Sequence, residues 1–299
     1  MALIPRLVKA ENMSAAHRGL IAVLALTCAA LAPIAPTPLD APPAAVAAAS
    51  SAPLTGVDIS WPQCPKGMGI PSRPTEGKPM PKKSARFVVV GLTNGPGFSP
   101  NPCLAKHVKW IKDHRVYAAP YAFTTYPTAS QLKKYGAAGP YRGTAKKTRL
   151  KNVGYAQASY NVATMKKVGL TAPFIWVDVE HSRPPAPWSK NTAYNKAVLD
   201  GVLAGYRAAG LKVGIYSSPS PWRSIVGRAR YGVPEWRTVG PASKSAALKK
   251  CSARSVQGGK TVMAQWWVDD SPTANSTDYN VLCPGYSTPS NLARYFHNY

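Results

Sequence analysis

Short apolar runs alternate with helical patterns along most of the chain. Residues 56–60, 86–92, 116–123, 174–179, 211–216 and 261–267 have the β-branched and aromatic content typical of strands. Between them, residues 102–114, 153–168 and 192–209 predict helices. In the last helix, small residues such as Gly201 and Gly205 predict a close-packing face, and Gly210 marks its end.

Strands that alternate with helices of this length indicate right-handed crossovers and a mostly parallel sheet. Six or more such strands favour a closed barrel over an open sheet. Residues 126–151 are basic and rich in turn residues, and we interpret them as the end of one connection and a surface insertion. Residues 226–257 have a similarly irregular pattern. The predicted fold class is therefore α/β.

The start of the chain has the pattern of a secretory signal. Arg6, Lys9 and Arg18 precede the apolar run 19–35, and Ala-Val-Ala at 45–47 offers a cleavage site. A membrane-spanning helix needs about 20 apolar residues, so the run is also almost long enough to remain as an anchor. We favour cleavage over anchoring, and we interpret residues 1–35 as a signal peptide, residues 36–54 as a Pro/Ala-rich linker and residues 55–299 as one domain.

Four cysteines follow the signal segment, and an even number in an exported chain indicates disulfides. Three pairings are possible, and proximity in sequence favours Cys64–Cys103 and Cys251–Cys283. The histidines are dispersed, and no CxxC pair or His-rich tract is present. We therefore predict no metal and no cofactor.

The chain is strongly basic. Its 37 Lys and Arg residues against 12 Asp and Glu residues give a formal net charge of +25. Such a charge favours polyanionic partners, namely nucleic acid, acidic membrane surfaces or the acidic polymers of a bacterial wall. We expect no nucleic-acid partner, because no recognisable motif is present and an exported, disulfide-bearing chain rarely meets one.

Two of the scarce carboxylates occur together at the end of an apolar strand. Asp178 and Glu180, in FIWVDVEH, are two residues apart and share one face with Phe174 and Trp176. Active sites form at this end of parallel barrel strands. Two carboxylates held there repel each other, so one is pushed toward the protonated form that glycoside cleavage requires. The alternative is a pair of strand-end carboxylates that cap a helix or bind Arg183.

Two further acids lie in similar positions. Asp58 lies between Val57 and Ile59 in GVDIS, where burial of a carboxylate without a role is costly. Asp278 lies in TDYNVLC, shortly after AQWW, and is also compatible with a turn. Asp269 and Asp270 have the pattern of a solvated turn.

The segments GVDIS, FIWVDVEH, VGIYSSPSPW and AQWW followed by DYN occur in this order, and together they resemble the family 25 glycoside hydrolases. These are lysozymes that cut the bond between N-acetylmuramic acid and N-acetylglucosamine in peptidoglycan. The resemblance covers residues 55–283 and implies that residues 55–299 form a catalytic, irregular TIM-like (β/α) barrel. Five β/α units would be followed by strands with little helix.

The resemblance also implies the roles of individual residues. Glu180 would be the general acid and base, and Asp178 would assist the substrate acetamido group as it attacks the anomeric carbon, giving retention. Asp58 and Asp278 would complete the acidic ring of the cleft. Side chains near predicted strand ends would bind sugar, whereas we assign Trp176 to the core. The sugar-binding candidates are Trp61, Tyr121, Tyr216, Gln265 and Trp266.

On this basis we expect a monomeric muramidase that is secreted or associated with the cell wall. Its partners would be peptidoglycan glycan strands, with acidic wall polymers bound by the basic surface. Two positions depart from the family pattern, because Asn94 replaces a common glutamate and Ala122 a common histidine. Both changes are expected to remove polar groups from the cleft. The alternative hypothesis is therefore a wall-binding protein that kept the barrel and lost useful catalysis.

Overall fold

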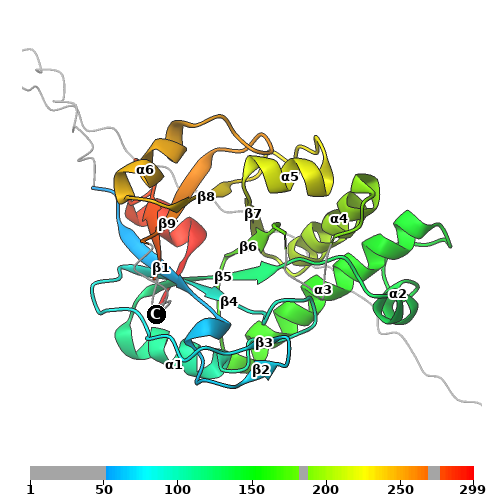
Figure 1. Cartoon of the computed structure of the whole chain (residues 1–299), viewed down its shortest axis with the longest axis horizontal. Coiled ribbons are helices and arrows are strands. Elements are labelled where there is room, and N and C mark those ends of the chain that lie inside the picture. Colours follow the sequence, from blue (N-terminus) through cyan, green and yellow to red (C-terminus); the bar gives the residue numbers. More distant parts are fainter. Residues whose placement is uncertain (1–51, 182–187, 269–276) are drawn as a thin grey trace, which may run out of the picture. The chain divides into compact units, whose positions relative to one another are not determined.

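The computed structural model describes residues 52–181, 188–268 and 277–299 (Figure 1). The signal segment, most of the 36–54 linker, Arg183 and the Asp269–Asp270 pair lie outside the described residues, so the expectations for them remain predictions. Within the described ranges, no helix is long and apolar enough to cross a bilayer.

Eight strands form a closed barrel, which confirms the predicted fold class. From β1 through β4, β5, β6, β7 and β8 to β9, neighbouring strands run parallel. Strand β10 runs antiparallel to both β9 and β1, and the pairing of β5 with β6 closes the ring. The barrel strands are β1 Thr55–Ile59, β4 Phe87–Gly91, β5 Tyr117–Phe123, β6 Phe174–Asp178, β7 Lys212–Tyr216, β8 Glu235–Pro241, β9 Thr261–Trp267 and β10 Asp278–Leu282.

Helices follow the five strands from β4 to β8, and β9 and β10 carry little helix, as the resemblance implies. Strand β1 differs, because the 3-10 turn η1 (Trp61–Gln63) and a hairpin of β2 (Gly69–Ile70) and β3 (Arg73–Pro74) follow it in place of a helix. The helices are α1 Leu104–His114, α2 Ala129–Tyr135, α3 Lys146–Val168, α4 Thr192–Ala208, α5 Pro219–Val226, α6 Lys244–Lys249 and α7 Pro289–Tyr295, with a 3-10 turn η2 at Lys250–Ser252.

Helices α3 and α4 lie side by side against the barrel (Figure 1). Glycines allow this close approach, since a Cβ atom on Gly201 would lie 2.0 Å from the Lys151 carbonyl oxygen. A Cβ atom on Gly154 would lie 2.0 Å from the Val198 carbonyl oxygen. The close-packing face predicted for residues 192–209 is thereby confirmed.

The irregular structure expected for residues 226–257 is wrong, whereas residues 126–151 form a connection from β5 to α3, as interpreted, that also contains a short helix. Residues 226–257 contain β8, α6 and η2, and residues 126–151 contain α2 and the first turn of α3. Strand β8 lacks the apolar pattern of a buried strand, because Glu235 and Arg237 form a buried ion pair at 3.3 Å on one of its faces. The buried face of helix α3 includes polar residues such as Asn152 and Gln157, so the helix lacks a continuous apolar stripe.

Aromatic side chains fill the barrel, and the end of the chain closes its floor. Trp176 is fully buried, as predicted, and its ring lies 6.1 Å from that of Trp236. From α7, Tyr295 contacts Phe174 with ring centroids 5.0 Å apart. Phe296, the next residue, packs against Phe87 at the same distance. Strand β11 (His297–Asn298) then pairs with the start of β5.

Both disulfides favoured by proximity are confirmed. Cys64, just after η1, is bonded to Cys103, which caps α1. Cys251, in η2, is bonded to Cys283, which follows β10. The first bond therefore ties the segment after β1 to α1, and the second ties η2 to the end of β10.

Candidate active site

The structure brings the four predicted carboxylates together at the carboxyl end of the barrel. Asp58 and Asp278 are direct cross-strand partners, because antiparallel β10 begins where β1 ends. Asp178 ends β6, and Glu180 follows two residues later. All four side chains line one cavity with a volume of about 280 Å³.

A larger cavity of about 610 Å³ adjoins the first. Tyr121, Asp178 and Glu180 line both cavities, so the two form one continuous cleft. The larger cavity is also lined by Trp61, by residues of the β2–β3 hairpin and by the segment after β4. Its lining residues are Trp61, Ser72, Arg73, Pro74, Glu76, Thr93, Gly95, Tyr121, Phe123, Asp178, Glu180 and His181.

A chain of hydrogen bonds fixes the buried Asp58 carboxylate. Its Oδ2 atom accepts hydrogen bonds from Gln265 Nε2 at 2.9 Å and from Asn280 Nδ2 at 2.7 Å. Tyr216 donates its hydroxyl hydrogen to Gln265 Oε1 at 2.8 Å, and Trp236 Nε1 donates to Asn280 Oδ1 at 2.7 Å. Because each amide is held at its other end, Asp58 has little rotational freedom.

Burial raises the pKa of every member of the acidic group. Burial, followed by the charge of Asp278, raises the pKa of Asp58 well above its ordinary value. The pKa of Asp178 is raised by burial and then by the charge of Glu180. Four carboxylates in one poorly solvated cleft cannot all be ionised, so the group retains protons at neutral pH.

Glu180 has the pKa expected of a proton donor near neutrality. Burial and the charge of Asp278 raise its pKa to about 7, and the nearby Arg73 opposes this increase. Burial also raises the pKa of Asp278 to about 6, with Lys78 acting in the opposite direction. A half-buried carboxylic acid that is protonated near pH 7 can deliver a proton to a leaving group.

The backbone at the end of β6 is held on both sides. Val179 donates its N–H to the Tyr216 carbonyl at 3.0 Å and accepts a hydrogen bond from Ser217 Oγ at 2.7 Å. Trp188 Nε1 donates to the Glu180 carbonyl at 2.9 Å.

Among the described residues, no side chain or backbone group hydrogen-bonds to the buried Asp178 Oδ1 atom. This oxygen belongs to a residue that lines both cavities, where a substrate group can bind it.

Four of the five sugar-binding candidates reach the cleft. Trp61 and Tyr121 line the larger cavity, and Tyr216 and Gln265 line the smaller one. The structure does not bring Trp266 there, because it stacks on Tyr279 outside the barrel with ring centroids 5.4 Å apart. Successive strand residues point to opposite faces, so Trp267, which shares the face of Gln265, lines the smaller cavity.

The two departures from the family pattern do not act as expected. Ala122 packs among residues such as Val177 in the core between barrel and helices, so it removes nothing from the cleft. Asn94 is fully buried and accepts a hydrogen bond from the Ile70 N–H at 2.8 Å, which ties the β2–β3 hairpin to the segment after β4. The asparagine at position 94 therefore affects how the hairpin is held.

Sequence reasoning missed several residues in and around the cleft, Trp267 among them. Asn280 and Trp236 orient Asp58, and Arg73 lines the larger cavity. The two-residue spacing from Asp278 could have indicated Asn280 within DYN. Trp236 lies in the strand that was not predicted, and nothing in the sequence pairs Arg73 with Glu180.

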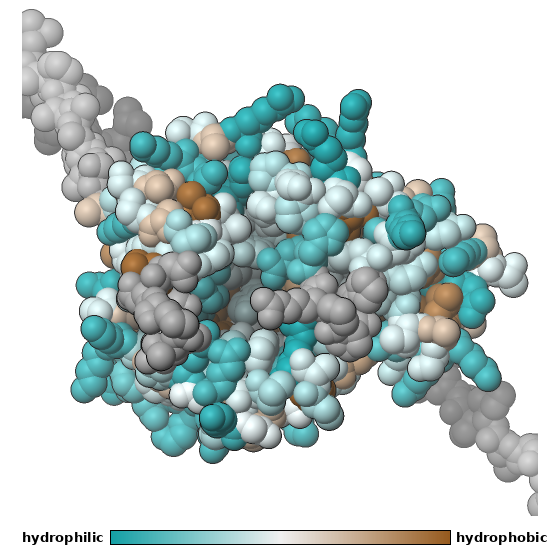
Figure 2. Space-filling model, in the orientation of Figure 1, coloured by the Kyte–Doolittle hydropathy of each residue, from teal (hydrophilic) through white to brown (hydrophobic). Residues whose placement is uncertain are grey.

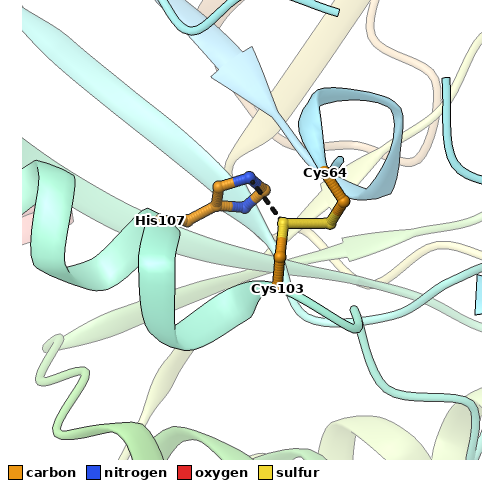
Figure 3. Close-up of side chains that lie close together, drawn as sticks. All are labelled: Cys64, Cys103 and His107. Carbon is orange, nitrogen blue, oxygen red and sulfur yellow. Dashed lines mark hydrogen bonds between the residues drawn. A yellow bond between two sulfur atoms is a disulfide. The ribbon is translucent and has the colours of Figure 1, made fainter. Parts of the chain in front are cut away.

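One group of side chains has the composition of a metal site. The sulfurs of Cys64 and Cys103 and a ring nitrogen of His107 lie within 4.8 Å of one another. Figure 3 shows the disulfide, with His107 Nε2 3.1 Å from Cys103 Sγ. The two sulfurs form a disulfide bond, so neither is a thiolate that could bind a metal. Burial lowers the pKa of His107 to about 4, so its ring is neutral. This group fits a structural role beside α1.

Comparisons with known proteins agree with this fold. A family model described as lysozyme-like protein 1 matches residues 144–237. Lysozyme-like protein 5 of Caenorhabditis elegans is 27% identical over 129 residues, which are 42% of this chain and 57% of that protein. The chain thus spans little more than half the length of this relative.

Solved structures match over a longer range. A bacterial lysozyme from Streptomyces coelicolor has a TM-score of 0.51 at 14% identity, over 82% of this chain and 98% of that one. A family 25 glycosyl hydrolase from Bacillus anthracis has a TM-score of 0.51 at 15% identity, over 82% and 94%. The resemblance to family 25 lysozymes that the motifs indicated is confirmed at the level of the fold.

Proposed function

We propose that the chain is a retaining glycoside hydrolase that cleaves the N-acetylmuramic acid–N-acetylglucosamine bond of peptidoglycan. The observation that carries this proposal is the position of Glu180, with a pKa near 7, in a cleft that it shares with three further carboxylates. The fold shared with lysozymes, some of them family 25 members, supports the same assignment.

In the proposed mechanism, Glu180 protonates the glycosidic oxygen as the bond to the anomeric carbon breaks. The acetamido oxygen of the substrate attacks that carbon, and ionised Asp178 binds the acetamido N–H and stabilises the positive charge that develops. Glu180 then removes a proton from a water molecule. This water attacks the anomeric carbon and opens the cyclic intermediate. Two inversions at the same carbon give net retention.

The protonation states support these roles. The charge of Glu180 contributes to the raised pKa of Asp178, so protonation of Glu180 removes that repulsion and favours ionisation of Asp178. Burial and then the charge of Asp278 raise the pKa of Glu180 to about 7, so a substantial fraction of Glu180 is protonated at neutral pH. Aromatic rings of Trp61 and Tyr121 provide flat surfaces for pyranose rings at the larger cavity.

Glu180→Gln tests the mechanism, because the amide keeps the shape of the side chain and cannot donate the proton. We expect a native circular dichroism spectrum and a loss of reducing-sugar release from purified peptidoglycan of about 100-fold or more. Asp113→Asn, on the exposed face of α1, is the charge-matched control. Mass spectrometry of the muropeptides identifies the bond that is cut.

Two outcomes would contradict the proposal in different ways. Release at the wild-type rate by Glu180→Gln would eliminate Glu180 as the acid. Binding of wild-type protein to insoluble peptidoglycan, without new reducing ends after long incubation, would instead favour the wall-binding alternative.

We also propose that the protein acts outside the membrane on an anionic wall. Hydrophilic residues cover most of the face shown in Figure 2. A basic pocket of about 490 Å³ between α3 and α4 is lined by Arg142, Lys147, Lys151 and Lys196, and its Asp200 is already bound to Lys196 at 2.8 Å. Retention on walls stripped of anionic polymers should be weaker, and retention on intact walls should fall with added salt.

A further inference from the structure

The β2–β3 hairpin places a cation beside the proposed general acid. We propose that the Arg73 guanidinium binds a carboxylate on the muramic acid unit of the substrate, either its free lactyl group or its peptide stem, and that Asn94 positions the hairpin that presents it. This inference rests on the proposed function and specifies the substrate: an acidic glycan in preference to a neutral one.

The hairpin is held rigidly before any substrate arrives. The Thr75 N–H donates to the Met68 carbonyl at 2.8 Å, and the Met68 N–H donates to Thr75 Oγ1 at 2.7 Å. Beyond the hairpin, the Gly77 N–H donates to the carbonyl of Cys64, a disulfide residue, at 3.0 Å. Arg73 is therefore presented from an ordered segment, which lowers the entropic cost of binding.

Asn94 ties both hairpin strands to the barrel. Its Oδ1 atom accepts the hydrogen bond from Ile70 of β2, and its Nδ2 atom donates to the Arg73 carbonyl of β3 at 3.3 Å. The neighbouring Gly95 has φ +79°, and a Cβ atom there would lie 2.5 Å from Arg73 Cδ. The Asn-Gly pair thus both anchors the hairpin and leaves space for the arginine side chain.

The charges of the cleft explain why an acidic substrate needs such a cation. Glu76, Asp178 and Glu180 line the larger cavity, with Glu76 paired to Lys78 at 3.1 Å, and the smaller cavity adds two aspartates. Among the described residues that line either cavity, Arg73 is the only lysine or arginine. A negatively charged sugar would be repelled here unless a cation offset the carboxylates, and a guanidinium can bind a carboxylate through two parallel hydrogen bonds.

Matched substrates separate this role from a general loss of activity. We would compare soluble peptidoglycan strands with the same strands after their carboxylates are converted to neutral amides. For wild-type protein, amidation should raise KM about tenfold, the order of effect of one charge-assisted contact, with little change in kcat. Arg73→Gln should raise KM for the native strands by a similar factor and be insensitive to amidation.

Further variants test the arrangement. Arg73→Lys keeps the charge without the planar fork and should fall between wild type and Arg73→Gln. Asn94→Ala should raise KM only for the native strands, and the double variant should be no worse than Arg73→Gln alone. The upper limb of the pH profile of Arg73→Gln should move to higher pH, because Arg73 lowers the pKa of Glu180. Arg228→Gln, on the exposed surface, is the control.

Equal loss by Arg73→Gln on native and amidated strands would overturn the inference, as would independent, additive effects of Asn94 and Arg73. Failure of the proposed function has a different signature, namely no reducing ends from either substrate with wild-type protein. In that case, native and amidated fragments can still be compared by their dissociation constants, measured by calorimetry with the Glu180→Gln variant. A preference for native fragments that Arg73→Gln abolishes supports the inference, and no preference refutes it.

Discussion

Removal of either disulfide should lower the free energy of unfolding by a similar amount, but the two removals should change the KM for the substrate differently. The two bonds close loops of 39 and 32 residues. The chain-entropy relation gives about 4 kcal/mol of stabilisation for each loop, because its dependence on length is only logarithmic. Paired Cys→Ala variants should therefore lower the free energy of unfolding by nearly equal amounts.

The functional effects should differ because the bonds hold different parts of the barrel. Cys64–Cys103 lies at the carboxyl end of β1 and encloses the hairpin that carries Arg73. Cys251–Cys283 follows β10, whose last residue lies at the opposite end of the barrel from the acidic group. We expect KM to rise several-fold without the first bond and to stay at the wild-type value without the second.

Urea unfolding followed by far-UV circular dichroism gives the stability loss, and kinetics are measured at a temperature where both variants are folded. The m-values should rise in both variants, since their unfolded chains expose more surface. Identical KM values for the two variants would refute the claim that the first disulfide holds the hairpin. Stability losses that differ by several kcal/mol would refute the entropic reasoning.

Three further predictions test the cleft and its support. Trp267→Ala should raise KM several-fold with little change in melting temperature, whereas Trp266→Ala should lower the melting temperature and leave KM unchanged, as shown by paired kinetics and calorimetry. Asp278→Asn should lower the upper pKa of the pH–activity profile, because the charge at position 278 raises the pKa of Glu180. In the folded wild type, the pKa of Asp278 is about 6, above its unfolded value, so the folded state binds more protons and stability falls as pH rises from about 4 to 6. This contribution, up to about 3 kcal/mol, should be absent from urea titrations of Asp278→Asn. Glu235→Gln should cost about 3 kcal/mol in the same titrations, because it leaves a buried arginine without its ionic partner.

The sequence predicted what depends on local pattern. Strands such as 174–179 are apolar on both faces because helices cover one side and the barrel interior lies on the other. The two-residue spacing of Asp178 and Glu180 was enough to place both on one face, and their common cavity agrees with it.

Features that depend on tertiary contacts could not be predicted in the same way. Strand β8 was missed because its Glu235 accepts N–H groups from residues 256, 257 and 259, a network that resembles a loop in sequence. Trp266 was assigned to the cleft together with its neighbour Gln265, although successive strand residues point to opposite faces, so only one of the two could reach the cleft. Arg73 was missed because the hairpin brings it to Glu180, and no spacing in the sequence indicates that contact.

The aromatic floor contributed by α7 has a consequence for how the molecule is made. Ribosomes add residues 289–299 after every barrel strand, so the nascent strands can pair only around an unfilled base. The base of the barrel interior is therefore closed only after Tyr295 and Phe296 can pack against Phe174 and Phe87. A chain truncated before Tyr295 should therefore expose aromatic surface at the base of the barrel and be a target for chaperones or proteases.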